Sequence, residues 1–154
     1  MKNKKLLFLI FAMTICVLAC SKQINKLEIS DDNFLFNAIG FKKQYKVETY
    51  LRAFDVGVYF KQPISKDDIK LGMLEVSIVS ENGQEQKIML IPNVRFFYSD
   101  YKNNLVNRIY FETINLGNEQ FVQELNVSLI NSFSVPVESE LLITNLGTEL
   151  FFVQ

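Results

Sequence analysis

Apolar and polar residues alternate with a period of two along most of the chain from residue 33 onward. This period is typical of strands that bury one face. The pattern predicts a first strand at residues 33–39 and the longest extended stretch at residues 45–60. Within that stretch the apolar positions change parity near Ala53 and Phe54. The change predicts a bulge or bend that moves the chain to the other sheet.

The second half of the chain continues the strand pattern. Asn82-Gly83 separates two alternating apolar runs and predicts a hairpin with a primed turn between residues 73–79 and 86–91. One helix is expected at residues 65–72, where Ser65 is a suitable N-cap and Gly72 a suitable end. Further strands are predicted at residues 107–116, 120–130, 140–145 and 149–153. About eight strands with one short connecting helix predict an all-β fold, an antiparallel, Ig-like β-sandwich, with an up-and-down barrel as the main alternative.

The first twenty residues have a different character. Three lysines precede an apolar run at residues 6–18, which has the length of a secretory signal rather than of a spanning helix. The run ends in Val17-Leu18-Ala19-Cys20, which resembles the lipobox of bacterial lipoproteins. That resemblance implies a signal peptide at residues 1–19, a lipidated (palmitate-bearing) Cys20, a polar tether at residues 20–26 and one β-sandwich domain at residues 27–154.

Cleavage at this position would decide the fate of both cysteines. Cys16 would leave with the signal peptide and Cys20 would carry lipid, so neither forms a disulfide or a metal site. Two acyl chains anchor a protein to a membrane far more stably than one. By resemblance to the lipoprotein sorting pattern, Ser21 implies the outer membrane, with the domain facing the periplasm or the cell surface.

The amino-acid composition limits the kinds of binding and catalysis that we expect of this chain. The chain has 16 basic and 17 acidic residues and no histidine. Without a basic patch, nucleic-acid binding is not expected. Without histidine there is no Ser-His-Asp triad and no histidine-ligated metal, so we expect no cofactor, no metal and no enzymatic activity. The Asp31-Asp32 and Asp67-Asp68 pairs are interpreted as a turn and a helix start. Glu138 and Glu140 remain open as a carboxylate pair on one strand face.

The segment at residues 95–104, RFFYSDYKNN, is the strongest candidate for recognition. It combines aromatic and charged residues in a turn-like stretch, and tyrosine and arginine are the residues that most often dominate binding energy at interfaces. Phe96 and Phe97 are expected to face the core. The predicted partner-binding residues are Arg95, Tyr98, Asp100 and Tyr101.

These observations favour a lipid-anchored envelope protein that binds another protein. The chain resembles small single-domain bacterial lipoproteins, some of which neutralise toxins delivered into the periplasm. That resemblance implies a periplasmic inhibitor or immunity protein, which needs surface complementarity and no catalytic group. The alternatives are a structural lipoprotein of a secretion or envelope assembly and a carrier of a small apolar or sugar ligand.

Overall fold

The computed structural model describes residues 26–136 and 138–145. Four of the expectations above fall outside the described residues: the signal peptide, the lipidated Cys20, the tether apart from residue 26, and the strand at 149–153. Within the described part the chain is all-β, with a single 3-10 turn, as predicted. The elements are β1 (Glu28–Asp31), β2 (Lys42–Ser65), η1 (Lys66–Asp68), β3 (Met73–Ser80), β4 (Glu85–Leu90), β5 (Arg95–Asp100), β6 (Leu105–Tyr110), β7 (Ile114–Asn131) and β8 (Ser139–Thr144).

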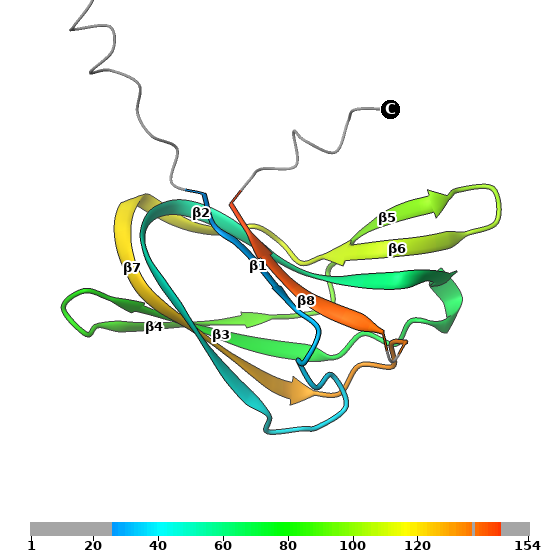
Figure 1. Cartoon of the computed structure of the whole chain (residues 1–154), viewed down its shortest axis with the longest axis horizontal. Coiled ribbons are helices and arrows are strands. Elements are labelled where there is room, and N and C mark those ends of the chain that lie inside the picture. Colours follow the sequence, from blue (N-terminus) through cyan, green and yellow to red (C-terminus); the bar gives the residue numbers. More distant parts are fainter. Residues whose placement is uncertain (1–25, 137, 146–154) are drawn as a thin grey trace, which may run out of the picture.

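The strands form two antiparallel sheets that share β2. One sheet has the order β1-β8-β2-β6-β5, and the other has the order β2-β7-β3-β4. Figure 1 shows β2 and β7 curving together through a wide arch, while β5 and β6 project as a hairpin from the opposite end. Because β2 belongs to both sheets, its residues fix how the two sheets meet.

The crossing of β2 between the sheets coincides with the predicted change of parity. Its first half pairs with β7 as far as Phe54, and its second half pairs with β8 from Asp55. The β2–β7 register shifts between Leu51 and Ala53. Val56 and Val58 are then completely buried in the sheet that contains β8. The predicted bend is therefore confirmed. It is needed because β2 crosses from one sheet to the other while its apolar side chains face the same core in both.

One continuous core lies between the sheets. It draws on every strand except β1 and β5, whose side chains Ile29, Phe96 and Tyr98 pack against its margin. Phe54, Phe60 and Phe111 are the largest fully buried side chains. Burial of one such side chain contributes about 1.5–3 kcal/mol, so the phenylalanine-rich composition is used mainly for stability. A second aromatic group, Phe34, Phe36, Phe41 and Phe133, closes one end of the core with ring centroids 5.0–5.7 Å apart.

The strand predicted at residues 33–39 is wrong. The chain turns after Asp31, whose carboxylate accepts a hydrogen bond from the Asn33 backbone N–H over 3.0 Å. Residues 34–40 then form a loop in which Phe34 and Phe36 are buried and Leu35 is exposed. Apolar and polar residues do alternate here, but the alternation arises because the rings of Phe34 and Phe36 are buried, and the segment forms no strand. As interpreted from the sequence, Asp31 lies at a turn.

The helix predicted at residues 65–72 is reduced to the three residues of η1. Ser65 is its N-cap and accepts from the Asp67 backbone N–H over 3.3 Å, as expected. The turn ends because Lys70 pairs with Ser134 in a β-bridge. Gly72 is no helix terminus: a Cβ there would lie 2.2 Å from the carbonyl oxygen of Asn131, so glycine is required by close packing.

Two further predictions differ in detail. The strand predicted at residues 107–116 is interrupted at residues 111–113, where the chain passes from β6 to β7. The β3–β4 hairpin is confirmed, but its turn is longer than a two-residue primed turn. Gly83 N–H donates to Ser80 O over 2.9 Å, and Ser80 N–H donates to Gln84 O over 3.0 Å. Gly83 has φ +77°, as a glycine-containing hairpin bulge requires.

Candidate functional site

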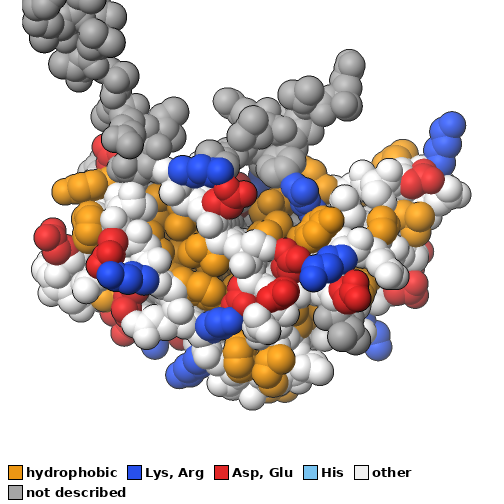
Figure 2. Space-filling model, viewed as in Figure 1, with side chains coloured by type: hydrophobic (Ala, Val, Ile, Leu, Met, Phe, Trp, Pro, Cys, Tyr) orange, Lys and Arg blue, Asp and Glu red, His pale blue; other side chains and the backbone are white. Residues whose placement is uncertain are grey.

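The four residues predicted to bind a partner lie on the β5–β6 hairpin. Figure 1 shows this hairpin projecting beyond the two sheets, and Figure 2 shows that it carries hydrophobic and charged side chains next to one another. Among the described residues, β5 pairs with β6 alone, from Arg95 opposite Tyr110 to Asp100 opposite Leu105. The structure thus brings the predicted residues together on one element, but it gives them different roles.

Arg95 is an anchor of the hairpin. Its Nη2 donates to Asp55 Oδ1 over 2.9 Å, and the hydroxyl of Thr113 donates to the same oxygen over 2.6 Å. The side chain of Asp55 is 8% exposed and that of Arg95 is 41% exposed. The ion pair therefore fastens the start of β5 to the crossing point of β2, and a large part of the guanidinium still reaches the surface.

Asp100 organises the turn of the hairpin. Its carboxylate accepts from the backbone N–H of Lys102 over 3.0 Å and from the side-chain amide of Asn103 over 2.6 Å. These hydrogen bonds, with Asn103 contributing most, hold the pKa of Asp100 below its usual value. Asn104 closes the turn with φ +57°, a conformation that asparagine tolerates. The sequence-predicted Asp100 is thus a turn-forming residue.

Tyr101 is the most exposed large hydrophobic residue in the described part of the chain, at 80%. Its ring stands against that of Tyr98 in an edge-to-face arrangement, with centroids 5.2 Å apart. Tyr98 in turn is half-buried and packs against the core. The pair forms a tyrosine step, defined here as Tyr98 and Tyr101, in which a fixed inner ring supports an exposed outer ring.

The outer edge of β5 is open within the described structure. Phe111 N–H donates to Val56 O over 2.9 Å, so alternate residues of β6 direct their backbone groups toward β2. Tyr110 then directs its backbone groups toward Arg95, and Arg108 directs its own toward Phe97. By the same alternation, the backbone N–H and C=O of Phe96 point away from the sheet.

The other sheet edges among the described residues are β1, β4 and the first half of β2, which carries Lys42, Lys43 and Lys46. β1 has only four residues, and two of them are acidic. β4 carries Glu85 and Lys87 near its start, and both side chains are exposed. Short length and charge are the usual devices that keep an edge from pairing with another chain. β5 has neither lysine nor proline and places Phe96, Phe97 and Tyr98 in succession, so it is the edge best suited to pairing.

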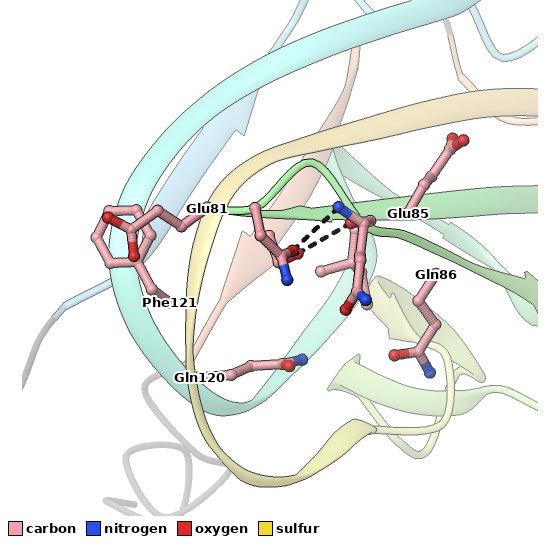
Figure 3. Close-up of a pocket in the computed structure, with 9 residues that line it drawn as sticks. Glu81, Glu85, Gln86, Gln120 and Phe121 are labelled. Carbon is pink, nitrogen blue, oxygen red and sulfur yellow. Dashed lines mark hydrogen bonds between the residues drawn. The ribbon is translucent and has the colours of Figure 1, made fainter.

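A polar groove of about 730 Å³, which no pattern in the sequence indicates, lies at one end of the sheet β2-β7-β3-β4. It lies between the β3–β4 hairpin and the bend of β7, and Figure 3 shows its lining. Gln86 of β4 and Gln120 of β7 direct their amide groups toward one another in this view. The lining residues are Ile78, Ser80, Glu81, Asn82, Gln84, Glu85, Gln86, Gln120 and Phe121.

The remaining candidates from the sequence do not assemble into a site. Glu140 contacts Lys61 and Ser30, and Glu138 precedes β8 at the surface, so the two carboxylates have separate surroundings. Among the described residues, no group of three or more acidic, cysteine or histidine side chains is arranged to hold a metal ion. Across the same residues, no helix has both the length and the apolar character needed to cross a membrane.

No family model, curated protein or solved structure matches this chain. Its functional interpretation therefore depends on the residues and the geometry described above.

Proposed function

We propose that this chain is a lipid-anchored envelope protein that binds another protein through the β5–β6 hairpin. The observation that carries the proposal is the open β5 edge, which lies next to the 80% exposed ring of Tyr101. The lipobox-like residues 17–20 support the anchor. The tether would hold the domain at a membrane surface, where it meets proteins that enter or span the envelope.

In the proposed mode, an extended segment of the partner adds to β5 as a further strand. The backbone groups of Phe96 would pair with it, and main-chain hydrogen bonds of this kind supply affinity in many peptide-recognition domains. The tyrosine step would supply side-chain contact at the end of the added strand. Tyrosines at such positions often contribute 2 kcal/mol or more to binding, on the order of a thirty-fold change in affinity.

We further propose that the partner protein is a toxin delivered into the periplasm. An immunity protein of this type acts by covering its target, so it needs a complementary surface and no reactive group. A projecting hairpin is well shaped for that task because it can enter a cleft of the partner. If the partners are instead several subunits of one envelope assembly, the protein is a structural component of that assembly.

The binding surface is tested by site-specific photo-crosslinking in the native envelope. A benzophenone amino acid replaces Tyr101 in the full-length protein, and the same amino acid at Tyr50, which is 51% exposed on the second sheet, is the matched control. We expect one discrete protein adduct from position 101 and none from position 50. Equal labelling at both positions, or no adduct at position 101, would contradict a hairpin interface.

The anchor is tested separately. Cys20→Ala should abolish incorporation of labelled palmitate and release the protein from the membrane fraction. Ser21→Ala, which leaves the thiol in place, should keep both properties. If the wild-type chain takes up no label, the lipid anchor is wrong, but the crosslinking result stands independently.

A further inference from the structure

We propose that the groove between the β3–β4 hairpin and β7 binds a neutral oligosaccharide. The groove lies on the sheet β2-β7-β3-β4, whereas the β5–β6 hairpin extends the other sheet, so the two surfaces are separate. Its volume of about 730 Å³ falls within the roughly 300–1,000 Å³ typical of small-ligand sites.

The donors and acceptors of the groove match those of sugar hydroxyls. Gln84 lines it from the β3–β4 turn, Gln86 from β4 and Gln120 from β7. A side-chain amide donates and accepts at once, and a hydroxyl group does the same, so each amide can pair with one or two adjacent hydroxyls. Within the described residues, no hydrogen bond holds the amides of Gln86 and Gln120, which remain available to a ligand.

The charge of the groove selects against anions. Glu81 and Glu85 line it, and no lysine or arginine is among the lining residues. Lys87 lies 3.9 Å from Glu85 and offsets part of one negative charge. A phosphate, sulfate or uronic acid would meet repulsion from Glu81 here. The Glu81 carboxylate can accept hydrogen bonds from neutral hydroxyls, whereas the Glu85 carboxylate already accepts one from the Ser77 hydroxyl.

An aromatic side chain supplies the apolar part of the lining. Phe121 is half-buried, and its ring is held edge-to-face by Tyr50 with centroids 5.3 Å apart. Pyranose rings have an apolar face of C–H groups that packs against aromatic rings. Figure 3 shows the Phe121 ring on the opposite side of the β7 backbone from the Gln120 amide, so Phe121 supplies an apolar margin of the groove against which one end of a sugar can pack.

The walls of the groove are fixed before any ligand arrives. Asn82 Oδ1 accepts from Ser80 Oγ over 2.6 Å and from Gln84 N–H over 3.2 Å, which holds the hairpin turn. At the β7 bend, Asn115 Oδ1 accepts from Gly117 N–H over 2.8 Å, and Gly117 has φ +78°. A preformed site loses less conformational entropy on binding, which suits a weakly held polar ligand.

The test uses the full-length protein in a detergent without a sugar headgroup. Cellotetraose and chitotetraose are added separately, with saturation-transfer NMR to detect contact and calorimetry to measure affinity. We expect at least one tetrasaccharide to bind. Gln86→Ala combined with Gln120→Ala should weaken that binding about tenfold, because two hydrogen bonds are lost. Gln62→Ala, an exposed glutamine remote from the groove, should leave it unchanged.

Three results would overturn the proposal. The first is no saturation transfer from the wild-type protein to either tetrasaccharide. The second is equal affinity in the wild type and the double glutamine variant, which would place the sugar elsewhere. The third is preferential binding of a neutral Gly-Ser tetrapeptide, which would make the groove a peptide site.

Discussion

Arg95 donates a hydrogen bond to Asp55 over 2.9 Å and thereby joins the first residue of β5 to the point where β2 changes sheets. Asp55 is buried, so its charge needs this partner and the Thr113 hydroxyl. The contact orients the hairpin that carries the proposed interface. Arg95, which the sequence pattern assigned to partner binding, thus holds in place the hairpin that carries the proposed interface.

Removal of the Arg95 side chain should destabilise the fold. Loss of one member of a buried ion pair costs about 3–5 kcal/mol, and partial exposure of this guanidinium reduces the expected cost for Arg95→Ala to about 1–3 kcal/mol. Arg52→Ala, at an exposed position of β2, should cost less than about 0.5 kcal/mol. Urea unfolding monitored by circular dichroism measures both.

A double-mutant cycle tests the pairing itself. Arg95→Ala and Asp55→Ala should be strongly non-additive, with a coupling free energy of about 1 kcal/mol or more. Additive effects would mean that the two side chains stabilise the fold independently.

Replacement by alanine should destabilise the fold at Gly57 and at Gly83, for a different reason at each position. At Gly57 a Cβ would lie 2.4 Å from the carbonyl oxygen of Ile109 and 2.5 Å from the Tyr110 ring, so Gly57→Ala should cost about 1–3 kcal/mol or more through steric overlap. At Gly83 no atom lies within 4 Å, and Gly83→Ala should cost about 1–2 kcal/mol through positive φ alone.

Asparagine distinguishes the two causes, because it adopts positive φ more readily than alanine. Gly83→Asn should recover much of the loss in melting temperature, whereas Gly57→Asn should be worse than Gly57→Ala. The opposite order at either position would show that the assigned cause is wrong.

Asp31 should make the stability of the fold depend on pH at the acid end. Burial raises its pKa, but hydrogen bonds from Lys43, Tyr45 and the Asn33 backbone outweigh burial and lower the pKa below the ordinary value of 3.8. Because the folded pKa lies below the unfolded one, the stabilisation is complete above pH 3.8 and is lost as the pH falls through the folded pKa.

The corresponding variant is Asp31→Asn. At neutral pH it should be less stable than the wild type by about 1–2 kcal/mol, and the difference should shrink toward pH 2. Asp32→Asn, at the neighbouring exposed position, is the control and should have little effect at any pH. A difference between Asp31→Asn and wild type that stays constant with pH would exclude titration of this carboxylate as the cause.

Tyr101 should matter for binding and hardly for folding. Its ring is 80% exposed, so Tyr101→Ala should change the melting temperature by no more than about 1–2 °C while it weakens partner capture. Tyr50→Ala offers a comparison on the other sheet and should leave capture intact. A large fall in melting temperature with unchanged capture would reassign Tyr101 to structural support.

The alternation of apolar residues predicted the antiparallel class, the crossing of β2 and the β3–β4 hairpin, because each depends on neighbours in the sequence. It failed at residues 33–39, where Phe34 and Phe36 alternate inward without a neighbouring strand to form a ladder. The helix at 65–72 failed for a related reason: the bridge between Lys70 and Ser134 joins distant segments and overrides a local capping signal.

The candidate functional sites likewise combine features that the sequence pattern indicates with contacts between distant residues that it does not. The aromatic segment of β5 was visible as composition, whereas the ion pair of Arg95 with Asp55 spans 40 positions and has no local pattern. The groove likewise combines residues 78–86 with residues 120–121, and single glutamines on separate strands carry no signal until β3 and β7 are placed side by side.

The most direct test of partner binding through the β5 edge compares two variants at one position. Phe96→Pro and Phe96→Ala both remove the same ring, but only proline removes the outward N–H. Each full-length variant is used to capture the protein identified by crosslinking at position 101, at a temperature where both are folded. We predict that the alanine variant retains capture and the proline variant loses it. Equal capture by both variants would contradict strand addition at β5.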